Sequence, residues 1–154
     1  MDYNDSYPTC ELTHATLRVY SDTMSPEEMA TALRVTPTSM QRKGDIRNPN
    51  GRRPVTLKLN ALFLGSEGLV ESLDARRHID WVLDQLEGRA AELAALIAMG
   101  ARADLSCFWI SASGHGGPTL SPQQCKRIAE LGVDCWFDVY LGGDNDEERR
   151  NQGQ

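Results

Sequence analysis

The chain has 154 residues, 40% of them hydrophobic and 25% charged, which suits one globular domain and excludes full disorder. Its 22 acidic and 16 basic side chains give a formal net charge of −6, which argues against a general nucleic-acid binder. The N-terminus lacks the basic and apolar regions of a secretory signal. No run approaches the roughly 18 apolar residues that a membrane helix needs, so we expect a cytoplasmic protein.

The first half of the chain predicts two strands, one helix and a long irregular segment. Residues 1–12 are polar and are expected to form a loose lead-in. Alternating apolar residues from Thr13 to Tyr20 predict a half-buried strand. Ser25-Pro26-Glu27-Glu28 has the N-cap, proline and capping-box residues of a helix start, and Pro37 ends that helix. Residues 36–54, the basic segment, hold five basic residues, three prolines and two glycines, with a short strand expected near Met40.

The second half predicts three strands and three helices. Alternation from Val55 to Leu64 predicts the second long strand of the domain. Helices are expected over residues 74–87, 89–99 and 121–132, and strands over 104–112 and 133–141. Apart from Asp134 and Asp138, the last strand is apolar on both faces, which is typical of a central strand. Residues 142–154 are expected to be a disordered tail.

This order of elements predicts a single α/β (α+β) domain over residues 13–141. Strands that alternate with helices favour a two-layer sandwich with helices on one face of a mixed sheet, ferredoxin-like or related. The catalytic motifs of phosphate loops, dinucleotide sites, hydrolases and zinc peptidases are missing from the sequence. The three histidines are widely spaced and the four cysteines form no C-x-x-C pair, so we expect no metal, cofactor or catalytic site.

Two loops offer candidate binding residues. In the basic segment, Gly44 would let the backbone approach an anion while Arg42, Lys43 and Arg47 clamp it. The alternative, which we favour, is a solvated loop. In the second loop, three glycines and a proline surround His115, which would titrate near neutral pH beside a ligand. A flexible turn with an exposed histidine is the favoured interpretation there.

The last strand offers a third candidate. Trp136, Asp138 and Tyr140 point to one side of it, so an acid flanked by two aromatic rings would form a binding platform. Asp138 would pair with an arginine of the basic segment or with a ligand cation. The alternative, which we favour, is a structural salt bridge under a helix, because a carboxylate on a central strand must be paired.

Short motifs in a particular order carry a family resemblance. An opening strand precedes Ser25-Pro26-Glu27-Glu28, Pro37-Thr38 and Arg42-Lys43-Gly44, and the later motifs are Leu120-Ser121-Pro122, Leu131-Gly132 and Asp138-Val139-Tyr140. In this order, residues 13–141 resemble the DUF4279 family, a bacterial domain of unknown function. One position departs: the resemblance leads us to expect a tryptophan at the start of the second long strand, where this chain has Val55-Thr56-Leu57.

The resemblance implies a compact cytoplasmic domain without assigned catalytic residues, and some members of the family are thought to be immunity proteins that neutralise toxins. With the small size and acidic charge, it predicts a non-enzymatic protein-binding module whose partner is a toxin. The alternative is a domain that binds a small anion, a nucleotide or a nucleic acid through residues 42–53. An enzyme with a dispersed site ranks last. No membrane partner is expected, and self-association is left open.

Overall fold

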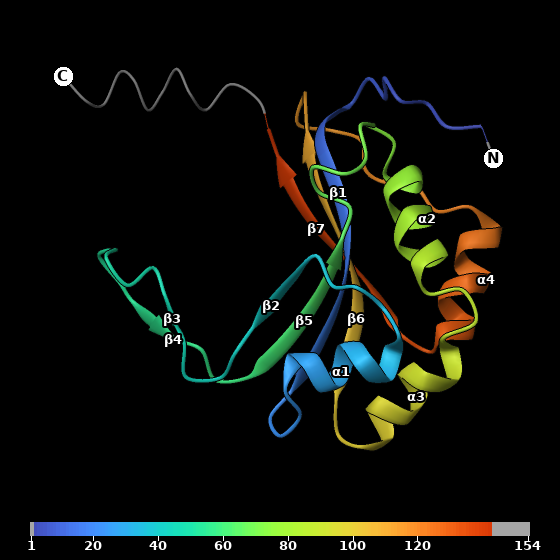
Figure 1. Ribbon diagram of the computed structural model, residues 1–154. Helices are drawn as coiled ribbons and strands as arrows, with labels where there is room; N and C mark the ends of the chain where they lie inside the picture. Colours follow the sequence, from blue (N-terminus) through green and yellow to red (C-terminus); the bar gives the residue numbers. More distant parts are fainter. Residues whose placement is uncertain (1, 143–154) are drawn as a thin grey trace.

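The computed structural model describes residues 2–142 and has two layers and one projecting arm (Figure 1). One layer is a five-stranded mixed sheet and the other is formed by four helices, so the two-layer α+β fold is confirmed. The helices are α1 (Pro26–Leu33), α2 (Ala75–Gln85), α3 (Ala90–Ala98) and α4 (Pro122–Leu131). All four lie on the same side of the sheet, which leaves its other face without a helical cover (Figure 1).

Strand β1 (Cys10–Ser21) is the centre of the sheet, whose order is β2-β5-β1-β6-β7. It pairs antiparallel with β5 (Asn60–Gly65) and β6 (Arg102–Ser111). β2 (Ser39–Gln41) lies outside β5, and β7 (Asp134–Leu141) lies outside β6 in a parallel pair. Helix α4 connects β6 to β7, as a parallel pair requires a crossover on one face.

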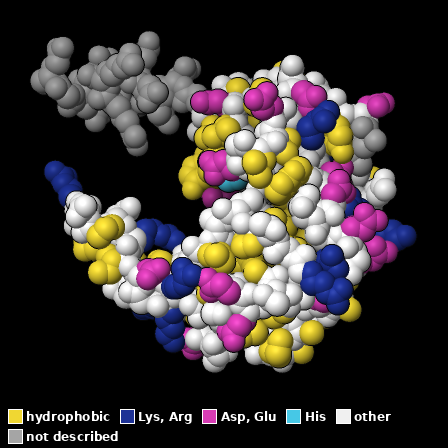
Figure 2. Space-filling model, in the orientation of Figure 1, with side chains coloured by type: hydrophobic (Ala, Val, Ile, Leu, Met, Phe, Trp, Pro, Cys, Tyr) yellow, Lys and Arg dark blue, Asp and Glu magenta, His cyan; other side chains and the backbone are white. Residues whose placement is uncertain are grey.

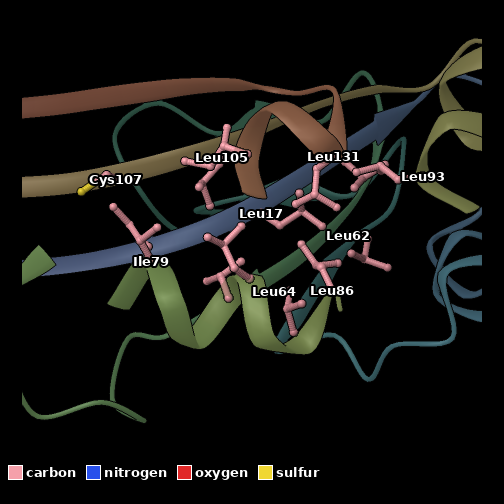
Figure 3. Packing of buried hydrophobic residues seen from close by; sticks show 14 of the residues in the cluster. Leu17, Leu62, Leu64, Ile79, Leu86, Leu93, Leu105, Cys107 and Leu131 are labelled. Carbon is pink, nitrogen blue, oxygen red and sulfur yellow. The ribbon is translucent and has the colours of Figure 1, made fainter. Parts of the chain in front are cut away.

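The hydrophobic core lies between the sheet and the helices (Figure 3). Alternate residues of the strands enter it, as the period of two predicts, and Trp109 is its largest fully buried side chain. The strand residues Leu17, Leu62, Leu64 and Leu105 meet the helical residues Ile79, Leu93 and Leu131 together with Leu86, which caps the end of α2. Capping boxes at Ser25 and Ser121 begin α1 and α4, as the sequence predicts.

Two predicted strands differ from the structure. The single strand expected over residues 55–64 is two strands, β4 (Val55–Thr56) and β5, because the chain turns between the arm and the sheet. β4 pairs with β3 (Ile46–Arg47) in a separate two-stranded sheet. The expectation that residues 133–141 form a central strand is wrong, since β7 is an edge strand. Its side chains are apolar on both sides, yet most of them are exposed.

The N-terminal residues are held against α2, in contrast to the loose lead-in that we expected. The Tyr3 hydroxyl donates to Asp80 at 2.8 Å, and the Asn4 backbone N–H donates to Asp74 at 2.8 Å. Burial and the bond to Asp80 raise the pKa of Tyr3 to about 12. Residues 10–12 already belong to β1. Of the tail expected over residues 142–154, all but Gly142 lies outside the described residues.

Candidate functional site

The face of the sheet opposite the helices, here called the open face, brings the polar positions of four strands together. The alternation that sends Leu17 and Leu105 into the core sends their neighbours to this side. The strand register sets Arg18 between Phe63 and Asp104, and Phe108 between His14 and Asp138. The open face therefore consists of His14, Thr16, Arg18, Tyr20, Phe63, Gly65, Asp104, Ser106, Phe108, Ile110, Trp136, Asp138 and Tyr140.

Three rings form a row across the open face. The His14 and Phe108 rings stack with centroids 4.8 Å apart and planes 13° apart. The Phe108 ring lies tilted against Tyr140 at 5.3 Å. Tyr140, at the end of this ring row, is 53% exposed, and Trp136 on the same strand is 58% exposed, so the β7 side of the face presents large aromatic surface to solvent.

On the open face, Arg18 is paired with an acid, whereas the Asp138 carboxylate has no partner among residues 2–142. Arg18 donates two hydrogen bonds to Asp104, at 2.6 and 3.0 Å, from strands that lie side by side. The bond to Asp104 outweighs burial and raises the pKa of Arg18, which keeps the guanidinium charged. Asp138 forms no hydrogen bond or ion pair within residues 2–142. Its half-buried carboxylate is therefore available to a partner from outside.

A hollow of about 440 Å³ lies on the open face. His14, Arg18, Phe63, Phe108 and Asp138 line it, with Glu67 and Thr38 from the adjoining loops. The His14 Nδ1 atom is buried and has no hydrogen-bond partner in the described chain. A buried nitrogen without a partner is a costly arrangement that a hydrogen-bonding ligand in the hollow would relieve.

The arm, residues 42–58, projects on the side of the sheet away from the helices (Figure 1). Strands β3 and β4 form it, and Gly44 adopts a φ of +93° where its N–H donates to the Leu57 carbonyl at 2.8 Å. The arm holds six basic residues and one acidic residue, whereas residues 2–41 and 59–142 hold eight basic and 17 acidic ones. A basic arm of net charge +5 therefore stands beside a body of −9, as the dark-blue side chains of Figure 2 illustrate.

A comparison with known protein families shows which family the chain belongs to. The family described as "Domain of unknown function (DUF4279)" matches residues 11–142. The chain belongs to this family. The match runs from β1 to β7 and so includes the open face and the arm of this DUF4279 domain. No curated protein and no solved structure matched the chain.

In this DUF4279 domain the predicted residues of the basic segment do not converge on one point. Arg42 forms an ion pair with Glu27 of α1, and Lys43 pairs with Asp22 at 2.5 Å. Arg47 instead donates to Gln41 at 2.9 Å. Each of the three side chains is tied to its own neighbour on the surface, so they form no anion clamp around Gly44.

Neutralising these three residues is expected to leave the fold intact. The triple variant Arg42→Gln, Lys43→Gln and Arg47→Gln should melt within about 3 °C of the wild type, because exposed ion pairs contribute little to stability. Arg18→Gln is the contrasting variant, because it breaks the half-buried ion pair with Asp104, which has two hydrogen bonds. It should lower the free energy of unfolding by about 1 to 2 kcal/mol. Thermal melts at low and high salt measure both effects. A larger loss in the triple variant than in Arg18→Gln would contradict this assignment.

The other predicted candidates separate into two groups. Trp136, Asp138 and Tyr140 share the open face, as the strand period indicates. The expectation that Asp138 forms a salt bridge under a helix or with the basic segment is wrong, because it faces away from the helices and forms no ion pair within residues 2–142. His115 lies on the exposed loop after β6, where Ser113 Oγ is 2.9 Å from its Nδ1. Among the described residues, His115 is not one of those that line the hollow.

Sequence reasoning missed His14, Arg18, Asp104 and Phe108. The alternation of β1 already placed His14 and Arg18 on its polar side, and this was the one signal available. Nothing local to the sequence shows that β6 pairs with β1, so the partners of His14 and Arg18 could not be named. The open face is a product of strand register.

Two cysteines of the sheet, Cys107 and Cys135, are held in the thiol form by their surroundings. Burial raises the pKa of Cys107 to about 12 and that of Cys135 to about 11, which keeps both as thiols at neutral pH. In the part of the chain that the structure describes, no three His, Cys, Asp or Glu side chains gather in a way that would hold a metal ion. No helix among these residues has the length and apolar character needed to span a membrane.

Proposed function

We propose that this DUF4279 protein is a non-enzymatic, cytoplasmic protein-binding module of the bacterial immunity type, which neutralises a toxin by occluding it. The observation that carries the proposal is the open face, an uncovered and half-apolar sheet surface that stands beside a basic arm. Sheets in two-layer domains bury one face, and an uncovered aromatic face on the other side marks an interaction surface.

The residue types on this surface support a protein partner. Trp, Tyr and Arg are the side chains most enriched among residues that dominate binding energy. Trp136 and Tyr140 are more than half exposed on the sheet, and the arm exposes Ile46 and Val55 at 54% each beside its arginines. These apolar groups lie outside the hollow, so the surface extends further than a small ligand would cover.

The two serine–histidine contacts give little support to an enzyme. Ser66 Oγ is 2.8 Å from His78 Nδ1, but both side chains are buried, Ser66 in the loop after β5 and His78 on α2, and both have structural partners. Ser113 and His115 are only two residues apart on an exposed turn. A serine nucleophile needs an accessible base that a third group orients, together with donors for the oxyanion. The Ser72 carbonyl orients His78, but the His78 ring and Ser66 are buried away from solvent.

The charges of the body and the arm indicate which surface charge the proposed partner should have. The acidic body would be attracted to a basic surface such as the substrate cleft of a nuclease, and opposite potentials speed association. The arm would then contact an acidic or neutral rim of the same partner, since its own charge has the opposite sign. This arrangement fixes one orientation of binding.

Removing the exposed aromatic pair tests the proposal. Full-length tagged protein is expected to co-purify with a stoichiometric protein partner from its native cells, and the double variant Trp136→Ala/Tyr140→Ala should weaken that complex by about 100-fold or more. Met99→Ala is the matched control, because Met99 is also 58% exposed but follows α3 in the helical layer. The affinity is measured by titration of the purified partner. A complex that tolerates the double variant, or that Met99→Ala disrupts equally, would refute this binding surface.

The basic arm supports a second candidate function, the binding of a small anion, a nucleotide or a nucleic acid. Its net charge of +5 is concentrated in 17 residues, and the ring row of the open face would stack nucleobases. Nucleic acid or nucleotide in the purified material, released by the triple variant of Arg42, Lys43 and Arg47 and by salt, would favour this candidate over the first.

A further inference from the structure

The outer edge of β7 carries an inference that is independent of the proposed function. Within residues 2–142, β6 is the strand hydrogen-bonded to β7, so the other side of β7 presents a row of unpaired backbone N–H and C=O groups. β7 is eight residues long and pairs with β6 without a register shift. The opposite edge of the sheet, β2, has only three residues.

This edge has few of the features by which strands avoid pairing with other chains, and its two aspartates, Asp134 and Asp138, are its charged residues. Lysine, proline, bulges and short length protect the edges of natural sheets. β7 reads Asp-Cys-Trp-Phe-Asp-Val-Tyr-Leu, without lysine, arginine, proline or glycine. Its apolar side chains are exposed on both sides of the sheet, with Phe137 at 39% and Val139 at 42% on the helical side and Trp136 at 58% on the open face. Such an edge is a template for an additional strand.

We propose that the additional strand is β7 of a second copy of this chain, paired antiparallel about a two-fold axis at Phe137. An axis at Phe137 sets Trp136 opposite Asp138 of the second copy and Asp134 opposite Tyr140. Each acid then faces an aromatic side chain with a polar hydrogen, and Cys135 faces Val139 on the helical side. Opposed residues lie on the same face of the joined sheet, as a two-fold axis perpendicular to it requires.

Neighbouring registers are less complementary. An axis at Asp138 sets the two Asp138 carboxylates directly opposite each other, and an axis at Trp136 opposes Asp138 to Asp134. Like charges directly opposed across two strands are destabilising. An axis at Val139 would leave Asp134 and Cys135 beyond the last described residue of the other strand. The Phe137 axis therefore gives the longest pairing without opposed acids.

The dimer would have consequences for the open face. The two sheets would form one continuous sheet with both open faces on the same side, and Trp136 would join the two surfaces. The two arms would stand at opposite ends, because each continues from β2 at the far edge of its own sheet. A self-complementary edge of this kind closes after two copies, which prevents open-ended growth.

Opposite charges at the axis give a register-specific test. Full-length wild type is expected to be a dimer at micromolar concentration by analytical ultracentrifugation. Phe137→Glu and Phe137→Lys should each be monomeric, since the axis opposes each new charge to itself, and an equimolar mixture should recover the dimer. Met40→Glu and Met40→Lys are the matched controls, because Met40 is 43% exposed on the opposite edge and should leave the dimer unchanged.

Substitution of Trp136 provides a second test that leaves the helical side intact. Trp136→Glu faces Asp138 of the second copy and should weaken the dimer at least tenfold more than Trp136→Lys does. Circular dichroism verifies that each variant is folded. A monomeric wild type, a dimer that survives Phe137→Lys, or equal effects of Trp136→Glu and Trp136→Lys would overturn the proposal. Loss of the dimer in the Met40 variants would place the interface at the other edge and overturn it as well.

Discussion

Replacing Asp74 by alanine is expected to lower the free energy of unfolding by about 3 kcal/mol. Asp74 is 2% exposed and caps α2, accepting the Arg76 backbone N–H at 3.0 Å and the Asn4 backbone N–H at 2.8 Å. The Arg76 guanidinium also binds both of its oxygens. The variant would lose the cap and release the N-terminal residues from α2. Urea denaturation at pH 7 measures the change.

At acid pH, the difference in the free energy of unfolding between the wild type and Asp74→Ala should become smaller. Burial alone would raise the pKa of Asp74, but the bonds from Arg76 and Asn4 outweigh it and hold the pKa below the ordinary 3.8. The stabilisation is therefore complete above that ordinary value and is lost as the pH falls through the lower pKa of the folded state. Asp84→Ala, in the same helix but with a side chain 63% exposed, is the control and should cost under about 1 kcal/mol. Equal losses in both variants would contradict the assigned role of Asp74.

Replacing His78 by glutamine is expected to cost about 2 kcal/mol at pH 7.5 and to flatten the pH dependence of stability. The ring is 2% exposed, and its Nε2–H donates to the Ser72 carbonyl at 2.9 Å, which leaves Nδ1 to accept from Ser66 Oγ at 2.8 Å. Burial, opposed in part by the Ser72 carbonyl, lowers the pKa of His78 below its ordinary 6.5.

The sign of the pH effect follows from this neutral ring. Below pH 6.5 the unfolded chain takes up a proton that the folded chain resists, so the wild type should lose stability as the pH falls and keep it fully above 6.5. In His78→Gln this contribution is missing between pH 7.5 and 5.0. His115→Gln, on an exposed loop, should retain the wild-type slope. If the slope of stability against pH is the same in His78→Gln as in the wild type, the assigned role of His78 is wrong.

Asp74 and His78 both support the loop between β5 and α2, which adjoins the open face. Ser66, whose Oγ accepts the Ala15 N–H at 3.0 Å, begins the loop between β5 and α2, and Asp74 ends it. Glu67 of this loop lines the hollow. The loop would therefore lose its anchors in either variant, and the affinity for the proposed partner should fall along with stability.

The sequence by itself determined the elements of this protein that depend on neighbours along the chain. Capping boxes at Ser25 and Ser121, the alternation of β1 and the placement of Trp136, Asp138 and Tyr140 on one side of their strand are all local. These features follow from hydrogen bonds three residues apart and from the period of two of a strand. The layer architecture followed as well, because an alternating order of strands and helices has few packed solutions.

Tertiary structure alone decided which strands are neighbours, and with that the candidate site. The apolar sequence of β7 is typical of a central strand, and only the sheet order shows that it is an edge. Arg18 meets Asp104, and His14 meets Phe108, across strands separated by more than 80 residues. Such pairings depend on how the whole sheet buries its apolar face against the helices, a long-range balance of packing that no local pattern records. The same balance left the opposite face uncovered and Asp138 without a partner in the described chain.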